Sequence, residues 1–170
     1  METLVFDTVL PVILCLPIEM PTVIQSAKRF LFKIIAKSAI AIYSRLPIFG
    51  DLRAALAVIR KDGLILMIDR NDGRGLSFPG GLSHFGEPAE RSMRREVLEE
   101  TGLQVDEARL LFEYRSTADI PCKVVVFAAT ATGQLGGSWE GTPRWLSPAE
   151  VQGRVLASQI EVVRRISSTA

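Results

Sequence analysis

The sequence has almost no net charge and very little sulfur, and both shortages exclude classes of protein. In 170 residues, 20 Lys and Arg side chains oppose 19 Asp and Glu side chains, which leaves a formal net charge of +1. Because broad nucleic-acid binding needs a strongly basic face, we expect none here. Two cysteines, Cys15 and Cys122, are too few for a disulfide framework. We expect each to be a small buried hydrophobe in a reducing, cytoplasmic compartment.

The first residues of the sequence are not expected to span a membrane or to act as a secretory signal. The apolar stretch 9–16 contains Pro11 and is too short to span a bilayer, which takes about 20 apolar residues. The charged side chains before it are Glu2 and Asp7, whereas a secretory signal begins with positive charge. These residues therefore predict neither a spanning helix nor a signal peptide.

A glycine-rich loop that leads into an acidic helix lies in the middle of the chain. The loop contains three glycines, which permit backbone conformations that a side chain would exclude: Gly80, Gly81 and Gly86. Glu87 and Pro88 are expected to open the helix, because proline suits a first helical turn. Gly102 is placed to end it in a left-handed cap.

The two faces of this helix differ in character. One face carries an apolar stripe at a four-residue spacing, formed by Ala89, Met93 and Val97. The other carries Glu96, Glu99 and Glu100, which are neighbours at the i, i+3 and i+4 positions. Three adjacent carboxylates repel one another unless a cation lies among them, and Mg²⁺ prefers oxygen ligands. The alternative is a solvated helix face with Glu–Arg pairs.

The spacing of these residues matches a known pattern. The stretch from Gly81 to Leu103 resembles the Nudix box, G-x5-E-x7-R-E-U-x-E-E-x-G-U, in which U is a bulky aliphatic residue. Every specified position is filled, in order by Gly81, Glu87, Arg95, Glu96, Val97, Glu99, Glu100, Gly102 and Leu103. The preceding Phe78-Pro79-Gly80-Gly81 also resembles the family's lead-in to the box. The likeness extends over about residues 52–167.

The resemblance implies an α/β fold, namely a Nudix-type α/β/α sandwich with a mixed sheet against which the box helix lies. Members hydrolyse a nucleoside diphosphate joined to another group X, and divalent cations bridge the box carboxylates and the diphosphate. The cofactor implied is Mg²⁺, with Mn²⁺ as the alternative. The ligands implied are Glu96, Glu99 and Glu100, with the backbone carbonyl of Gly80 as a further ligand.

The resemblance also implies roles for neighbouring residues. Arg95 is expected to orient the glutamates through charge-assisted hydrogen bonds, with Glu87 supporting that arrangement. The resemblance leaves two candidates for the general base. One is a box glutamate, for which the predicted catalytic set contains Glu96 and Glu100, and the other is a carboxylate on a later loop. Glu140 is the later candidate, because it lies shortly before Arg144-Trp145; a solvated loop glutamate is its alternative interpretation.

Two further residues are predicted to contact substrate. Gly81 begins the box, and His84, the only histidine of the chain, lies in the x5 segment, where the family specifies nothing. A solvated loop histidine is the alternative interpretation of His84.

Outside the box, the sequence predicts a catalytic domain over residues 51–170. Apolar runs predict strands at 54–59, 64–68, 76–79, 109–114, 123–130 and 144–146, and Lys61-Asp62-Gly63 predicts a hairpin turn between the first two. Ser147 to Glu150 forms a capping box with proline at the first helical position. The helix that it opens is expected to run to about Ile166.

Residues 1–50 are predicted to form a separate N-terminal helical extension. A capping box at 22–25 opens a helix to about Arg45, with a basic stripe of Arg29, Lys33 and Lys37 among apolar residues. Such a helix suits the surface of a membrane, and it equally suits a homodimer contact, or packing on the domain, through residues 22–46. Both interpretations stay open, so the chain is expected to be cytoplasmic, with or without peripheral membrane association.

The sequence therefore predicts a Mg²⁺-dependent pyrophosphohydrolase. Its substrate would be a small-molecule nucleoside diphosphate derivative, whose diphosphate linkage is cleaved by attack of water at phosphorus. The alternative is a Nudix-like regulatory domain that senses a nucleotide without turning it over. Such domains usually have a degraded box, whereas this box is complete.

Overall fold

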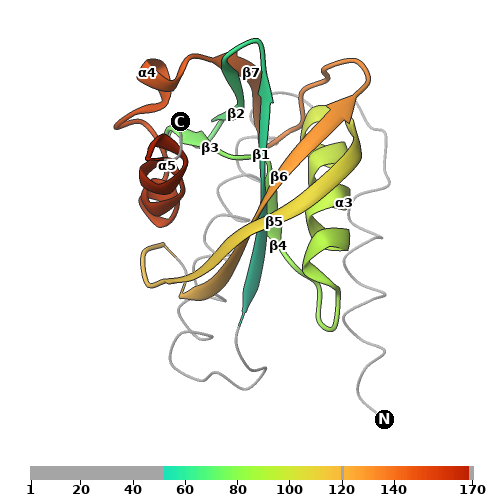
Figure 1. Ribbon diagram of the computed structural model, residues 1–170, viewed down its shortest axis with the longest axis vertical. Helices are drawn as coiled ribbons and strands as arrows, with labels where there is room; N and C mark the ends of the chain where they lie inside the picture. The colour runs from blue at the N-terminus through green and yellow to red at the C-terminus, as the bar shows by residue number, and fades with distance from the viewer. Residues whose placement is uncertain (1–51, 120, 169–170) are drawn as a thin grey trace, which may run out of the picture. The chain divides into compact units, whose positions relative to one another are not determined.

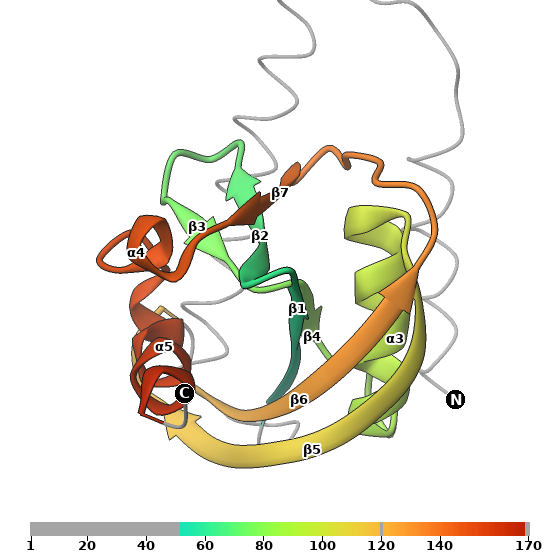
Figure 2. The ribbon, with the colours of Figure 1, turned by 45° about the horizontal axis from the view of Figure 1, so that its top comes forward.

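The computed structural model describes residues 52–119 and 121–168 of the chain, seen in two views in Figures 1 and 2. The predicted helix from Thr22 to about Arg45, the hinge before residue 52 and the burial of Cys15 all lie outside these residues. The division at residue 50 and the contact through residues 22–46 therefore stay predictions. Within the described ranges, no helix is long and apolar enough to cross a membrane.

The described residues form a mixed sheet with helices on both sides. In chain order, the elements are β1 Arg53–Lys61, β2 Leu64–Arg70, β3 Leu76–Ser77, β4 Gly80–Leu82, α3 Ala89–Thr101, β5 Gln104–Ser116, β6 Cys122–Thr132, β7 Gly141–Leu146, α4 Pro148–Val151, the 3₁₀ turn η1 Ala157–Gln159 and α5 Ile160–Ser167. All six predicted strands are present. The strands at 109–114 and 123–130 are longer than predicted, because β5 and β6 pair with each other over nearly their whole lengths, well beyond the apolar runs.

Strand β1 organises the sheet. It runs parallel to β6, from Arg53 opposite Lys123 to Ile59 opposite Ala129, and antiparallel to β2 and β4. The order is β3-β2-β1-β6-β5, with β4 paired to β1 and β7 paired to β2. One parallel pair among antiparallel ones makes the sheet mixed, as predicted.

The hairpin between β1 and β2 is also confirmed. Asp62 and Gly63 have positive φ angles of 52° and 78°, which is what a two-residue type I′ turn requires. Lys61 and Leu64 face each other on either side of this turn.

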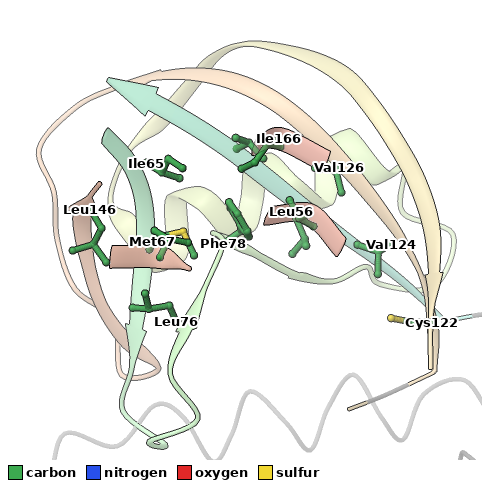
Figure 3. Packing of buried hydrophobic residues seen from close by; sticks show 13 residues of the cluster. Leu56, Ile65, Met67, Leu76, Phe78, Cys122, Val124, Val126, Leu146 and Ile166 are labelled. Carbon is green, nitrogen blue, oxygen red and sulfur yellow. The ribbon is translucent and has the colours of Figure 1, made fainter. Parts of the chain in front are cut away.

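Two apolar layers cover the faces of the sheet. On one face, Met93 and Val97 of α3 are fully buried against strand residues that include Val125 and Phe127, which confirms the predicted stripe. On the other face, Val162 and Ile166 of α5 pack with a cluster shown in Figure 3. This second cluster includes Leu56, Met67, Phe78, Cys122 and Val126. Figure 1 shows α3 on one side of the strands and α5 on the other, so the predicted α/β/α sandwich is confirmed.

The expected single helix over 148–166 is wrong. The capping box at Ser147 is present, but α4 ends at Val151 and Gly153 adopts a positive φ of 74°. The backbone of residues 154–156 then exchanges hydrogen bonds with Leu76 of β3. Because the N–H and carbonyl groups of these residues form a β-bridge with Leu76, they cannot also form the hydrogen bonds of a helix. Helical structure resumes only at η1 and α5.

The buried stripe of α3 yields a test of the packing. We expect Met93→Ala to lower the free energy of unfolding by about 3 kcal/mol, because it removes a fully buried side chain and leaves a cavity. Leu98 lies on the same helix with 54% of its surface exposed, so Leu98→Ala should cost less than about 0.5 kcal/mol. Urea unfolding of both variants measures the difference, and equal costs would contradict this packing.

Candidate active site

The turn into β4 brings backbone and carboxylates into close contact. Gly80 has φ of 137°, and a Cβ there would lie 2.1 Å from the carbonyl oxygen of Ala55. A Cβ on Gly81 would lie 2.8–2.9 Å from the carboxylate atoms of Glu96. Both positions therefore require glycine, the first for pairing with β1 and the second to leave room for the Glu96 side chain.

Helix α3 begins one residue later than predicted. Pro88 is its N-cap, and Glu87 lies outside the helix, where its side chain turns back toward Arg95. The helix ends at Thr101, and Gly102 adopts the predicted left-handed cap with φ of 72°. Glu87, Glu96 and Glu99 thus meet at the Arg95 guanidinium.

Arg95 contacts three glutamates. Its Nη1 donates to Oε1 of Glu96 at 2.8 Å and to Oε2 of Glu99 at 3.3 Å. Its Nε and Nη2 donate to the two carboxylate oxygens of Glu87 at 3.3 and 3.1 Å. This hydrogen-bonded pairing lowers the pKa of Glu87 to about 2. Glu87 therefore fixes the guanidinium beside Glu96 and Glu99.

Glu100 is the most buried carboxylate of the group, with 4% of its surface exposed. Its Oε2 accepts a hydrogen bond of 2.8 Å from the backbone N–H of Gly80. Burial, followed by the charges of Glu140 and Glu96, raises the pKa of Glu100 to about 8. Burial also raises the pKa of Glu96, against the opposing effect of Arg95. The site thus holds carboxylates that lack full charge compensation.

The structure also brings Glu140, from the loop before β7, into the electrostatic environment of Glu96 and Glu100. Glu140 precedes β7, and its carbonyl oxygen accepts a hydrogen bond of 2.9 Å from the N–H of Asn71, next to the end of β2. Its carboxylate is half-buried, and its charge contributes to the raised pKa of both Glu96 and Glu100. The late-loop candidate and the box carboxylates therefore share one electrostatic environment.

Arg70 is a site residue that sequence reasoning missed. It ends β2 opposite Gly141, and its side chain is 17% exposed. A two-nitrogen pairing with Asp72, at 2.7–3.2 Å, raises its pKa, and the charges of Glu140 and Glu100 raise it further. The sequence feature that could have identified Arg70 is its place at the end of an apolar run, just before a loop that contains Asp-Gly.

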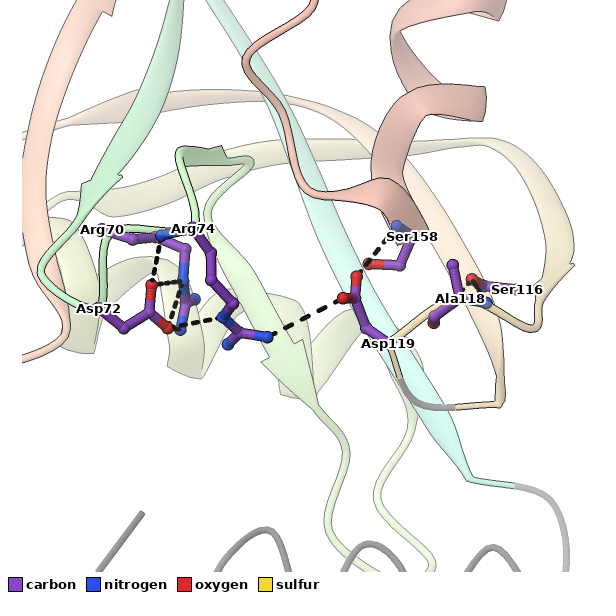
Figure 4. Close-up of polar contacts among 7 residues, drawn as sticks. All are labelled: Arg70, Asp72, Arg74, Ser116, Ala118, Asp119 and Ser158. Atoms are coloured by element: carbon purple, nitrogen blue, oxygen red, sulfur yellow. Dashed lines mark hydrogen bonds and ion pairs between the residues drawn. The ribbon is translucent and has the colours of Figure 1, made fainter. Parts of the chain in front are cut away.

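Asp72 links this arginine to a wider polar network, drawn in Figure 4. It also accepts from Nε of Arg74 at 2.9 Å, and Arg74 approaches Asp119 at 4.0 Å. Asp119 in turn accepts from the backbone N–H of Ser158 at 3.1 Å. The loop that carries Asp72 is therefore tied to the β5–β6 loop and to η1, which holds Arg70 in place.

His84 lies in the turn that precedes α3, and its contacts are with Glu87. Its imidazole is exposed, and its Nδ1 lies 4.0 Å from Oε2 of Glu87. Its backbone N–H donates to that same oxygen at 3.0 Å. The structure therefore places His84 beside Glu87, which is one of the partners of Arg95.

Comparisons with known proteins agree with this geometry. The NUDIX domain model matches residues 51–166, which include the whole box and β7. The chain belongs to the Nudix family. A MutT-like protein of Streptomyces ambofaciens is 34% identical over 110 residues, which are 64% of this chain and 71% of that protein.

Solved Nudix structures share the fold. A MutT NUDIX hydrolase from Burkholderia pseudomallei matches with a TM-score of 0.62 at 21% identity, over 69% of this chain and 98% of that one. A MutT protein from Bacillus halodurans matches with a TM-score of 0.60 at 22% identity, over 68% and 81%.

This Nudix chain is an enzyme of the phosphoric-anhydride hydrolase class, which disfavours the purely sensing domain considered above. The family acts on small nucleoside diphosphate derivatives and generally uses divalent metal ions.

The residues present fit such an ion chemically. Across residues 52–119 and 121–168, no three Asp, Glu, His or Cys side chains are already arranged as a metal site. Even so, Glu96, Glu99 and Glu100 offer hard oxygen donors, and the absence of a side chain on Gly81 leaves room for the Glu96 carboxylate, with which a Cβ would clash. In that same described part, no Lys or Arg forms an ion pair with the buried Glu100.

The raised pKa of Glu100 predicts how stability depends on pH in the metal-free protein. The unfolded chain releases this proton near its ordinary value of 4.5, whereas the folded chain releases it near 8. Between these values the folded state binds more protons, so the free energy of unfolding falls as pH rises. One such group contributes at most about 1.4 kcal/mol per pH unit.

Urea unfolding in EDTA at several pH values between 5 and 8 (roughly the window of that shift) measures this slope. We expect Glu100→Gln to flatten it, because the amide does not titrate, and Glu107→Gln to leave it unchanged, because Glu107 is exposed on β5. A wild-type slope in Glu100→Gln would show that Glu100 is not the group responsible.

Proposed function

We propose that this enzyme is a Mg²⁺-dependent pyrophosphohydrolase. Its substrate is a nucleoside diphosphate joined to a further group, and the reaction is attack of water on one phosphorus of the diphosphate. The observation that carries the proposal is the burial of Glu96 and Glu100, which raises the pKa of both carboxyls, with a smaller contribution from neighbouring like charges. Carboxylates in this condition gain most from a bound divalent cation.

In this proposal, Glu96, Glu99 and Glu100 hold Mg²⁺, together with the carbonyl of Gly80. Oxygen donors favour Mg²⁺, or Mn²⁺ in its place, over softer metals. When bound, the ion supplies positive charge to the diphosphate and lowers the pKa of a coordinated water. Arg95 orients Glu96 and Glu99 through the hydrogen bonds described above, and Glu87 anchors the guanidinium.

Glu140 is the proposed general base, and it takes the proton of the attacking water. Its half-buried position and its electrostatic influence on Glu96 and Glu100 support this role. Arg70, held by Asp72, supplies positive charge that interacts with both Glu140 and Glu100. Gly81 and His84 are also proposed to contact substrate.

The first test is a panel of nucleoside diphosphate derivatives, assayed for phosphoanhydride cleavage with Mg²⁺ and with EDTA. We expect cleavage only with the metal. Glu100→Gln should reduce kcat/KM by about 100-fold or more, equivalent to about 3 kcal/mol of transition-state stabilisation. Its matched control, Glu107→Gln, should behave as wild type. Full activity in EDTA, or in Glu100→Gln with Mg²⁺, would contradict the proposed metal site.

The second test concerns the base. We expect Glu140→Gln to lower kcat by at least about 100-fold, because proton transfer contributes on this scale. KM should stay within about twofold, since the amide keeps the shape of the carboxylate. Steady-state kinetics on the best substrate of the panel separate the two constants. If both constants remain at wild-type values, the base is a box glutamate instead.

A further inference from the structure

Gln159 is a buried polar residue to which the proposed mechanism gives no role. It ends the 3₁₀ turn η1, and only 7% of its surface is exposed. A glutamine is seldom buried, because its amide loses hydrogen bonds to water that the protein must replace. Its burial therefore calls for a specific partner inside the domain.

That partner is the backbone of Phe78, which lies 81 residues earlier in the chain. The N–H of Phe78 donates to Oε1 of Gln159 at 2.8 Å, and this hydrogen bond is buried. Phe78 lies between β3 and β4, and it takes no part in the residue pairs that join these strands to β2 and β1. Gln159 therefore satisfies a buried N–H that the sheet does not satisfy.

The next two residues of the chain are fixed by hydrogen bonds as well. The carbonyl of Pro79 accepts from an N–H of β1 at 2.8 Å, and the N–H of Gly80 donates to Oε2 of Glu100 at 2.8 Å. Proline has no N–H and a restricted φ, so the contact before it and the contact after it together set the course of the backbone. Gln159 provides the first of these contacts from outside both the box and β1.

The break in the C-terminal helical region brings Gln159 to this place. The N–H of Leu76 donates to the carbonyl of Arg154 at 2.8 Å, and the N–H of Leu156 donates to the carbonyl of Leu76 at 2.9 Å. The N–H of Gln159 then donates to the carbonyl of Leu156 at 2.8 Å. Because a continuous helix would keep these groups in helical hydrogen bonds, the break is what attaches η1 to β3 and places Gln159 beside the turn into β4.

The residue before Gln159 is held from the other direction. The carbonyl of Ser158 accepts from the hydroxyl of Tyr114 on β5 at 2.6 Å. Its N–H donates to the carboxylate of Asp119 in the β5–β6 loop at 3.1 Å, as Figure 4 shows. The turn η1 is thus attached to β3 on one side and to β5 and its loop on the other. A side chain that extends from such a doubly attached turn can hold a backbone group in one orientation.

We propose that Gln159 is a positioning residue for the catalytic site. By holding the N–H of Phe78, it orients the peptide groups that lead into β4. The N–H of Gly80 then reaches Glu100, and the carbonyl of Gly80 keeps the orientation that metal binding requires of it. Gln159 itself contacts neither metal nor substrate. This inference rests on the proposed function, and it extends the site to η1, which lies outside the Nudix box.

The test compares two substitutions of similar size. Gln159→Met keeps the length of the side chain and removes the acceptor oxygen, whereas Gln159→Glu keeps an acceptor oxygen at that place. We expect Gln159→Met to weaken Mn²⁺ binding, followed by electron paramagnetic resonance, by about tenfold, because outer contacts of a metal site act on this scale. At saturating metal its kcat should fall by about tenfold, while KM stays within about twofold. Gln159→Glu should restore most of both losses.

Val162→Ala is the matched control that separates positioning from stability. Val162 is fully buried in α5 and belongs to the same apolar cluster as Phe78, so its truncation destabilises the domain without removing a hydrogen bond from the turn into β4. We expect its Mn²⁺ affinity, kcat and KM to match wild type at a temperature at which circular dichroism shows every variant to be folded. Equal losses in Val162→Ala and Gln159→Met would overturn the proposal, because Gln159 would then act through stability alone.

An NMR experiment in EDTA separates this inference from the proposed function, because it requires neither metal nor turnover. The amide proton shift of Gly80 reports its hydrogen bond to Glu100. We expect this signal to move upfield in Gln159→Met, to return in Gln159→Glu and to stay unchanged in Val162→Ala. If no nucleotide is cleaved but this pattern is seen, the proposed hydrolysis fails and the positioning role stands. If cleavage occurs and Gln159→Met matches wild type in amide shift, Mn²⁺ affinity and kcat, the positioning role fails alone.

Discussion

The site depends on the close approach of α3 to the glycine turn at residues 80 and 81. Without a side chain on either residue, β4 can pair with β1 and the carboxylates of Glu96 and Glu100 can reach the turn. The N–H of Gly80 binds Glu100, and the empty side of Gly81 accommodates Glu96. Strand β4 and helix α3 therefore meet where several carboxylates lie close together, and these carboxylates give the site its chemistry.

Arg95 and Arg70 balance this charge from two sides. Arg95 is fixed by Glu87 and holds the more exposed glutamates, whereas Arg70 is fixed by Asp72 and faces the buried end with Glu140. Each arginine is thus held by an acid that has no metal-binding role in our proposal. The group keeps a shortage of positive charge at Glu100, which is the property that a divalent cation would correct.

The sequence predicted the parts of the fold that local chemistry determines. Fixed spacing identified the box, the Lys61–Gly63 turn identified the first hairpin, and Ser147 identified a helix start. It did not predict that Arg70 lies beside Glu140, because that contact follows from the pairing of β2 with β7, two strands far apart in the chain. The break after Val151 was missed for a similar reason: its cause is a bridge to Leu76, which an apolar periodicity cannot reveal.

The most direct test of this account is metal affinity in a glycine variant. Titration of Mn²⁺, followed by its electron paramagnetic resonance signal, should give at least about tenfold weaker binding for Gly81→Ala, because the new Cβ occupies the space of the Glu96 carboxylate and displaces a ligand. Gly136→Ala is the matched control, since a Cβ there meets nothing within 4 Å, and it should bind as wild type. Equal Mn²⁺ affinity in wild type, Gly81→Ala and Gly136→Ala would contradict the claim that the α3 carboxylates at this turn form the metal site.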